Sequence, residues 1–162
     1  MSVAIRILHD APLLTRNTFG VEATAPLLAE VIDATALPEL MARVEFAAQP
    51  PLVIGGGSNL LFAANPDMPL IAMTGHGVSI ARDDGERANV RAGAGVAGDG
   101  LVKPTVLDGF AGLENLALIP GTVGAAPIQN IGAYGVEVRE FIHAVEAFEA
   151  ASGQVHRLVA GR

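Results

Sequence analysis

The sequence predicts an α+β domain. Three observations support this fold class: an apolar helical face near residue 40, a strand–helix–strand unit that ends in three consecutive glycines, and two segments with hairpin signals. The chain has 162 residues, of which 51% are hydrophobic, so it can bury a sizeable core. It is therefore expected to be one globular domain, or two small lobes that share a core.

The first half of the chain predicts one strand–helix–strand unit. Residues 26–33 form an apolar strand, and apolar side chains then recur at helical spacing over residues 37–44. Thr35 is the expected N-cap of this helix. A short apolar strand at 52–54 follows two prolines and runs directly into the glycines 55–57.

The second half predicts mainly β-structure. Residues 70–73 are expected to form a strand, and residues 78–92 a hairpin around the Asp-Gly turn at 83–86. A second hairpin is expected over 144–159, with its turn at 152–153.

One helix between these hairpins is poorly supported by its composition. Residues 96–109 have apolar residues at helical spacing, but Gly98, Gly100 and Pro104 lie among them. An interior proline costs about 3 kcal/mol and a glycine about 1 kcal/mol relative to alanine. We therefore expect this helix to begin late, to kink or to be short.

Composition excludes several classes of function. The chain has 17 acidic and 10 basic residues, a net charge of −7 and a single lysine, Lys103, which argues against nucleic-acid partners and against a P-loop. It has no cysteine, and therefore no thiolate site. The sequence shows neither a signal peptide nor an apolar run long enough to span a membrane, so a cytoplasmic location is expected.

The side chains that most often catalyse reactions or bind metals form no recognisable constellation. The four histidines, His9, His76, His143 and His156, have no paired spacing, and no metal site is predicted. The acidic cluster at 83–86 is interpreted as a solvated turn. No catalytic residue is assigned.

Glycines concentrate in one part of the chain: sixteen of the nineteen lie between Gly55 and Gly135. The first group follows a strand, where successive backbone N–H groups can form a concave anion-binding nest of the size of a diphosphate. A plain flexible turn is the alternative. The candidate residues of this loop are Ile54, Gly55, Gly56, Gly57, Ser58, Asn59 and Leu60.

A second glycine group, residues 93–98, has the spacing Gly-x-Gly-x-x-Gly. A dinucleotide-binding fingerprint needs a buried parallel strand before it and a sound helix after it. The preceding residues 89–92 alternate like a hairpin arm, and Pro104 interrupts the following helix. A Rossmann-type NAD(P)-binding protein is therefore retained only as an alternative.

The longest motif, residues 112–135, alternates small and apolar residues. Small side chains allow the backbone to pack against a flat ligand ring, and Thr122, Gln129 and Asn130 supply the few polar groups that a cofactor pocket needs. A tightly packed loop without a ligand is the alternative.

These motifs together resemble a known family. Asn17-Thr18-Phe19-Gly20, the Gly-Gly-Gly-Ser-Asn-Leu-Leu loop and the segment from Gly112 to Gly135 occur in the order and spacing of the UDP-N-acetylenolpyruvoylglucosamine reductases, flavoenzymes of peptidoglycan synthesis. The resemblance runs from about residue 9 to the end of the chain. It implies a two-lobed FAD-binding domain of the vanillyl-alcohol-oxidase type, with mixed sheets, flanking helices and FAD held between lobes 1–65 and 66–162.

The resemblance also implies a function and a set of contacts. NADPH would reduce FAD, and the reduced flavin would deliver a hydride to the enolpyruvyl group of a nucleotide-sugar substrate in a protein that is monomeric at full length. Thr18 would lie near the flavin ring, and residues 54–60 would bind the diphosphate. The ring and ribityl chain would contact Ile119, Pro120, Gly121, Thr122, Gly124, Ala125, Ala126, Ile128, Asn130, Gly132, Ala133, Tyr134 and Gly135.

The sequence departs from the family pattern in two places. The family's Tyr-Arg-Asp-Ser segment and its C-terminal substrate domain are absent from these residues, so the chain alone is expected to be inactive; Arg162 does not lie in that motif. Gly98, Asp99, Gly100 and Pro104 stand where the family has an aromatic-containing helix. A non-catalytic flavin-binding remnant is a further alternative.

Overall fold

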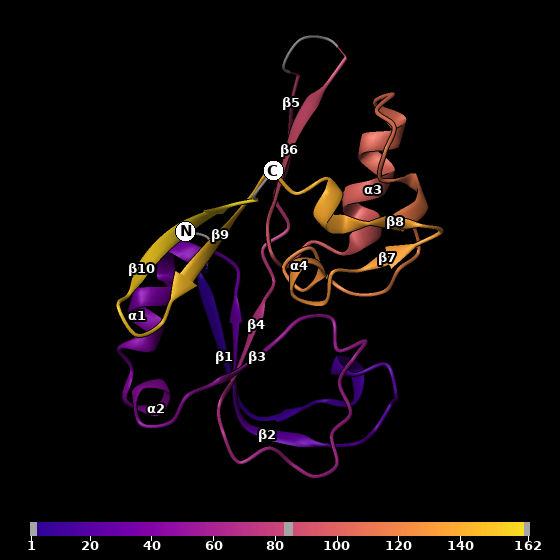
Figure 1. Ribbon diagram of the computed structural model, residues 1–162. Coiled ribbons are helices and arrows are strands. Elements are labelled where there is room, and N and C mark those ends of the chain that lie inside the picture. Colours follow the sequence, from indigo (N-terminus) through magenta and orange to yellow (C-terminus); the bar gives the residue numbers. More distant parts are fainter. Residues whose placement is uncertain (1–2, 83–85, 161–162) are drawn as a thin grey trace. The chain divides into compact units, whose positions relative to one another are not determined.

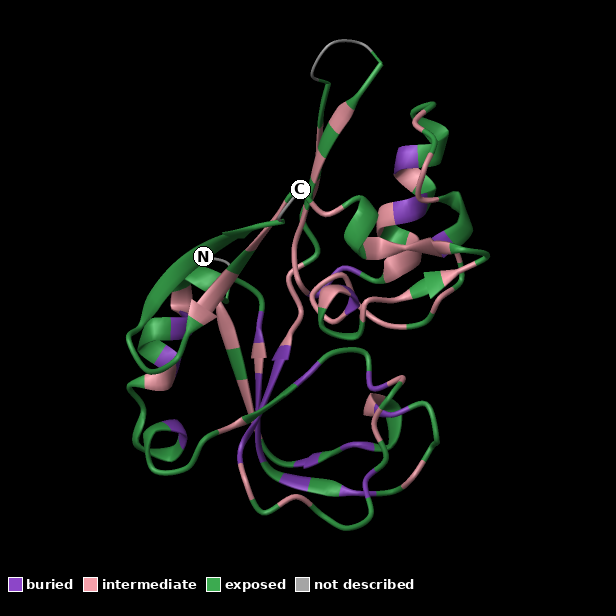
Figure 2. Ribbon diagram, viewed as in Figure 1, coloured by how far each residue is buried: buried purple, intermediate pink, exposed green. Residues whose placement is uncertain are grey.

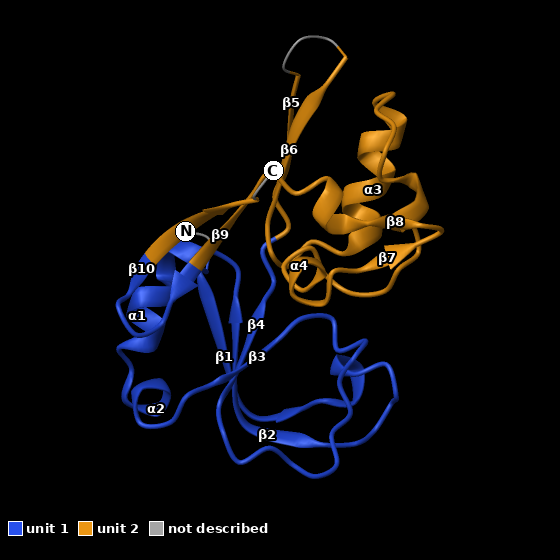
Figure 3. Cartoon of the chain, in the orientation of Figure 1, with its two compact units in different colours: residues 1–75, 148–154 blue, residues 76–147, 155–162 orange. Residues whose placement is uncertain are grey.

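The computed structural model describes residues 3–82 and 86–160 (Figure 1). These residues fall into two compact units (Figure 3). Unit 1 comprises the chain up to Gly75 together with Phe148–Gln154, and unit 2 comprises His76–Ala147 and the segment from Val155 onward. Unit 1 extends past the expected lobe boundary at residue 65 because a further strand, at residues 70–73, belongs to its sheet.

Unit 1 is built on a four-stranded mixed sheet in the order β1-β2-β4-β3. Its strands are β1 (Ile5–Pro12), β2 (Thr24–Val31), β3 (Leu52–Ile54) and β4 (Leu70–Met73). β1 pairs antiparallel with β2, whereas β4 lies parallel to both β2 and β3. Three of these strands match the sequence prediction; β1 was not predicted, since the burial of its residues does not alternate regularly.

The helical connection from β2 to β3 is broken into short pieces, and the single helix expected over 37–44 is wrong. The pieces are the 3₁₀ turn η2 (Ala34–Ala36), α1 (Leu37–Met41) and α2 (Val44–Ala47), and the break between the α-helices falls at Arg43, whose φ of −68° and ψ of 141° are extended. Thr35 is not the N-cap either, because it donates its own N–H to the Asp33 carboxylate at 2.9 Å.

Apolar side chains cover both faces of the unit 1 sheet. Figure 2 shows buried residues along its strands. Leu70 and Ala72 of β4 enter one cluster with Leu13 and Phe62, and Ile71 between them enters the other cluster with Leu40, Phe46 and the partly buried Phe148. This alternation is the two-residue period of a strand buried on both faces. The glycine loop follows β3, which is an edge strand of the sheet and pairs with the buried strand β4.

Unit 2 contains short elements joined by long turns. They are β5 (Val78–Arg82), β6 (Ala88–Ala92), α3 (Gly98–Leu107), the 3₁₀ turns η3 (Glu114–Leu116) and η4 (Val138–Glu140), α4 (Ala126–Gln129), β7 (Gly132–Ala133) and β8 (Val136–Glu137). β5 and β6 form the expected antiparallel hairpin, and the central residues of its predicted turn, 83–85, lie outside the described residues. The second expected hairpin is also confirmed, as β9 (Ala144–Glu149) and β10 (Gln154–Val159), with Gly153 at φ +70°.

Helix α3 runs from Gly98 to Leu107 and is therefore shorter than the range 96–109, which is one of the three expected outcomes. Both glycines lie in its first turn, where helix propensity matters least because the N–H groups have no intrahelical acceptor. The Gly98 N–H instead donates to the carbonyl of Gly121 at 3.1 Å, outside the helix. Burial of Val102 and Thr105 anchors the following turn, so tertiary contacts offset the cost of Pro104.

Candidate functional site

The glycine loop after β3 packs closely against the segment that contains Thr18. Thr18 donates its backbone N–H to the carbonyl of Gly57 at 3.1 Å. Gly57 is buried at φ +70°, and a Cβ there would lie 1.9 Å from the carbonyl oxygen of Arg16. No side chain fits at that distance, so only glycine allows the two backbones to touch. The structure thus brings together Thr18 and the glycine loop, both predicted as cofactor contacts.

Asn17 shapes the loop that carries Thr18, and the sequence analysis did not assign it a role. Its side chain is buried; Nδ2 donates to the carbonyls of Leu13 at 2.8 Å and Val21 at 3.0 Å, and Oδ1 accepts the Val21 N–H at 2.9 Å. These bonds close the loop in the way that an asparagine organises a turn. The available signal was the Asn-Thr-Phe-Gly sequence, in which Gly20 takes φ +64°.

The rest of the glycine loop presents backbone donors. Within the described part of the chain, the N–H groups of Gly55, Gly56 and Ser58 donate to no protein group. Gly55 and Gly56 are exposed, and Ser58 is half-buried. Neighbouring N–H groups without a protein acceptor can bind an oxyanion. Ile54 differs from the other predicted residues, because its side chain is buried in the unit 1 core.

In unit 2, the predicted segment 119–135 pairs with the second glycine group. Val123 donates to the carbonyl of Val96 at 2.8 Å, Gly124 donates to that of Ala94 at 2.9 Å, and Ala97 forms a bridge with Thr122. A Cβ on Gly124 would lie 2.7 Å from the Cβ of Ala94, so this contact also requires glycine. Small residues here serve backbone-to-backbone packing.

This pairing overturns the Rossmann alternative for residues 93–98. A dinucleotide fingerprint needs a buried parallel strand before the glycines and free N–H groups at the start of the helix. Here the preceding strand, β6, is an antiparallel hairpin arm, and the Gly98 N–H bonds to Gly121. The backbone of residues 94–98 instead pairs with the 121–124 turn.

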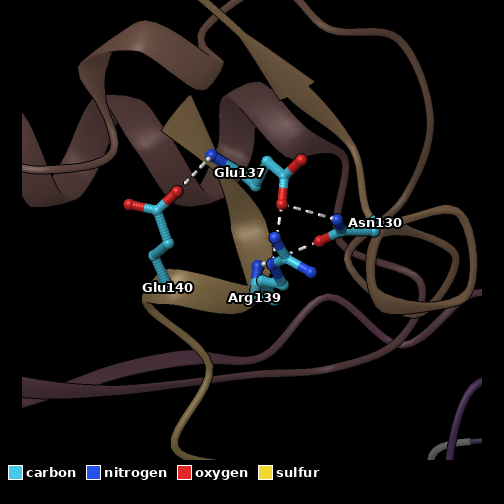
Figure 4. A network of polar contacts seen from close by, with 4 residues as sticks. All are labelled: Asn130, Glu137, Arg139 and Glu140. Atoms are coloured by element: carbon cyan, nitrogen blue, oxygen red, sulfur yellow. Dashed lines mark hydrogen bonds and ion pairs between the residues drawn. The ribbon is translucent and has the colours of Figure 1, made fainter. Parts of the chain in front are cut away.

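Asn130 is held by its neighbours rather than left open to a ligand (Figure 4). It takes a left-handed conformation, with φ 45° and ψ 56°, where α4 ends. Its Nδ2 donates to Glu137 Oε2 at 2.9 Å, and its Oδ1 accepts the Arg139 N–H at 3.3 Å. Both ends of the amide are therefore occupied, and sequence reasoning missed Glu137 as the partner that holds it.

The hairpin β7–β8 projects exposed side chains beside these held residues. Tyr134 and Gly135 form its turn with φ values of +54° and +81°, and Gly132 pairs with Glu137 at its base. Tyr134 of this turn is 89% exposed, and Ile128 of the preceding helix α4 is 85% exposed. Side chains this apolar and this exposed offer a contact surface for a flat ligand or another chain.

Asp99 of α3 holds Leu118, the residue just before the 119–135 segment. Leu118 has φ +63° and donates its N–H to Asp99 Oδ1 at 2.8 Å. Lys103, one turn further along α3, pairs with the other carboxylate oxygen at 3.1 Å. The Leu118 hydrogen bond, followed by Lys103, lowers the pKa of Asp99 below its ordinary value. The carboxylate is therefore ionised at neutral pH and holds the strained turn before Ile119.

Metal-binding clusters and membrane-spanning helices are two further features that bear on the kind of site. In residues 3–82 and 86–160, no group of three or more histidine, aspartate or glutamate side chains is arranged to hold a metal ion. No helix in that part of the chain is long and apolar enough to cross a membrane.

Similarity to known proteins shows the family to which this chain belongs. The family model described as "FAD binding domain" matches residues 27–159. The chain belongs to the FAD binding domain family. The match includes the glycine loop and all of the 119–135 segment, and it agrees with a FAD-binding fold of mixed sheets and helices.

Several curated relatives of this FAD binding domain share one name. The chain is 50% identical over 155 residues to the UDP-N-acetylenolpyruvoylglucosamine reductase of Xylella fastidiosa (strain 9a5c), covering 95% of the chain and 44% of the relative. It is 53% identical over 150 residues to the reductase of the same name from Xanthomonas axonopodis pv. citri (strain 306), covering 93% of the chain and 43% of the relative. The chain thus spans less than half the length of these relatives.

Solved structures agree on the fold. The reductase of this name (MurB) from Thermus caldophilus superposes with a TM-score of 0.73 at 26% identity, covering 96% of this chain and 52% of that one. CrmK, a flavoenzyme of caerulomycin biosynthesis, superposes with a TM-score of 0.68 over 99% of this chain and 34% of that one, at 19% identity, which supports the fold alone.

Proposed function

We propose that this domain binds FAD as part of an NADPH-dependent reductase that converts UDP-N-acetylglucosamine enolpyruvate to UDP-N-acetylmuramate. The observation that carries the proposal is the FAD binding domain match over 27–159, combined with 50% identity to a reductase of that name. The finer fold type, vanillyl-alcohol oxidase, and a division into two lobes are part of the proposal. A cytoplasmic, monomeric full-length protein acting on a nucleotide sugar completes it.

The glycine loop of unit 1 fits the diphosphate of FAD. Its backbone donors at Gly55, Gly56 and Ser58 have no protein acceptor in the described residues. The buried hydroxyl oxygen of Thr74, which follows β4 at the same end of the parallel strands, also has no partner there. The net charge of −7 does not oppose this assignment, since oriented N–H dipoles bind oxyanions without a side-chain cation.

The 119–135 segment of unit 2 is proposed to contact the isoalloxazine ring and the ribityl chain. Its turn at 121–124 presents backbone and small side chains, which a planar ring can approach closely. Thr18 in unit 1 is proposed to contact the ring. In both units the chain's own share of the work is to bind and orient the cofactor and to exclude water from it.

The chemistry that bound FAD supplies is hydride acceptance from NADPH and hydride donation to an enolpyruvyl double bond. No residue in the described part of the chain is assigned a proton-transfer role, because none of its histidines or carboxylates is buried beside the glycine loop or the 119–135 segment. Residues that complete the reaction are proposed to belong to the part of the relatives that this chain does not span.

A visible absorption spectrum of the purified chain, taken before and after incubation with FAD and desalting, tests this proposal. We expect the flavin bands in the blue part of the visible spectrum to co-elute with the protein and to shift relative to free FAD. NADP⁺ and FMN, added in parallel, are the controls for a generic nucleotide site. A chain that melts cooperatively yet retains no FAD, or that retains NADP⁺ alone, would overturn the assignment.

A further inference from the structure

The candidate segment 119–135 ends in a hairpin whose base is closed by one carboxylate. Glu137 Oε2 accepts the Nδ2 of Asn130 at 2.9 Å and the Nε of Arg139 at 2.7 Å (Figure 4). Its side chain also accepts the N–H of Glu140, and Glu140 in return accepts the N–H of Glu137 at 3.1 Å. The carboxylate is thereby fixed from three directions.

This arrangement constrains Asn130 more than an ordinary helix end would. A four-residue helix such as α4 contributes little stability of its own. Asn130 nevertheless holds a left-handed conformation, and both ends of its amide are bonded, to Glu137 and to the N–H of Arg139. The direction in which the chain leaves α4 is therefore set by Glu137, which lies seven residues later.

The residues between these two partners have little freedom. Val138 donates to the carbonyl of Ile131 at 2.9 Å, and a Cβ on Gly132 would lie 2.8 Å from the carbonyl oxygen of Val136. The two strands of the hairpin are thus in backbone contact, and the exposed Tyr134 lies at their turn. Loss of the bond at the base would release the turn as well.

We propose that Glu137 is a positioning residue, which acts through Asn130 to hold the 131–135 turn in the conformation that receives the flavin. The inference rests on the proposed function. It differs from the sequence-based assignment of Asn130 as a direct cofactor contact, because the amide of Asn130 is committed to Glu137 and Arg139. The binding groups are then the backbone and the side chains of the turn itself.

The test compares Glu137→Ala with Glu137→Gln in the whole 162-residue chain. Glutamine retains an oxygen acceptor for the Asn130 amide, whereas alanine retains none. Bonds to charged groups are the stronger class, so we expect Glu137→Ala to raise the FAD dissociation constant roughly tenfold or more, and Glu137→Gln to restore most of the affinity. Glu146→Ala, which removes an exposed carboxylate paired with Arg91, is the matched control and should leave it unchanged.

A second pair of variants tests the same proposal independently, in case the Glu137 variants misfold. Asn130→Gly keeps access to the left-handed conformation but loses the amide, and it should weaken FAD binding as Glu137→Ala does. Asn65→Gly, which removes an amide that accepts the Thr24 N–H in unit 1, should weaken it less. Hydrogen exchange without FAD should show faster exchange at Val138 in both Glu137→Ala and Asn130→Gly.

The outcomes separate the two proposals. If the wild type binds FAD and Glu137→Ala binds it equally well, the positioning role falls and the proposed function stands. The positioning role also falls, and the proposed function again stands, if glutamine fails to rescue binding. If the wild type binds no FAD, both proposals fall, and the wild-type titration alone reveals this.

Discussion

Replacing Gly57 by alanine tests the contact on which the unit 1 site depends. The added Cβ would lie 1.9 Å from the Arg16 carbonyl oxygen and 2.6 Å from its carbon, and Gly57 has φ +70°. The left-handed conformation costs an L-residue about 1–2 kcal/mol, and overpacking a buried contact costs typically 1–3 kcal/mol more. We therefore expect the free energy of unfolding to fall by about 2–5 kcal/mol.

Gly20→Ala is the matched control, because Gly20 has φ +64° and its Cβ would meet nothing within 4 Å. This variant should lose only the conformational cost of about 1–2 kcal/mol. Urea unfolding measures the free energy for both variants, and an FAD titration measures their dissociation constants. Gly57→Ala should also weaken FAD binding, since the loop must move away from Thr18. Equal losses of stability in the two variants would refute the close-approach argument.

Three further predictions concern the loop, a histidine and an acid-sensitive contact. Gly56→Val should abolish FAD binding by covering the exposed N–H groups of the loop; an unchanged flavin content would contradict the diphosphate assignment. His143→Ala should leave flavin content unchanged and shift stability by less than about 0.5 kcal/mol, as exposed substitutions do, and a large drop in flavin would count against it. The pKa of Asp99 is lowered by the Leu118 N–H and then by Lys103, so its stabilising contribution is present above the unfolded pKa and is lost as pH falls through the folded value. Between about pH 6 and about pH 2, the free energy of unfolding should therefore fall more steeply with decreasing pH in the wild type than in Asp99→Ala. Parallel plots of this free energy against pH would oppose the prediction.

The sequence predicted the strands and hairpins that depend on residues close together in the chain. The strands at 52–54 and 70–73 and the hairpins at 78–92 and 144–159 were predicted because apolar runs and glycine turns act over a few residues. The glycine loop after β3 was predicted for the same reason. Strand β1 was not predicted, and even in the folded sheet, where it pairs with β2, the burial of its residues does not alternate regularly.

Contacts between distant residues decided the rest. The break of the predicted helix at Arg43 follows from burial of both Leu40 and Phe46 in one cluster, which no local pattern encodes. Residues 93–98 had a nucleotide-binding glycine spacing, yet the backbone of this segment pairs with residues 121–124. The spacing of the glycines cannot indicate this pairing, because residues 121–124 lie beyond helix α3 in the sequence.

The sequence by itself determined the family motifs, the fold class and the two glycine-rich segments, because each depends on the types of residues that lie close together in the chain. Only the tertiary structure decided why particular residues are required. Gly57 must be glycine because the Arg16 backbone touches it, and Asn130 is bonded to Glu137. Both facts depend on which backbones meet after folding, and that is fixed by burial of the core rather than by the residues of either segment alone.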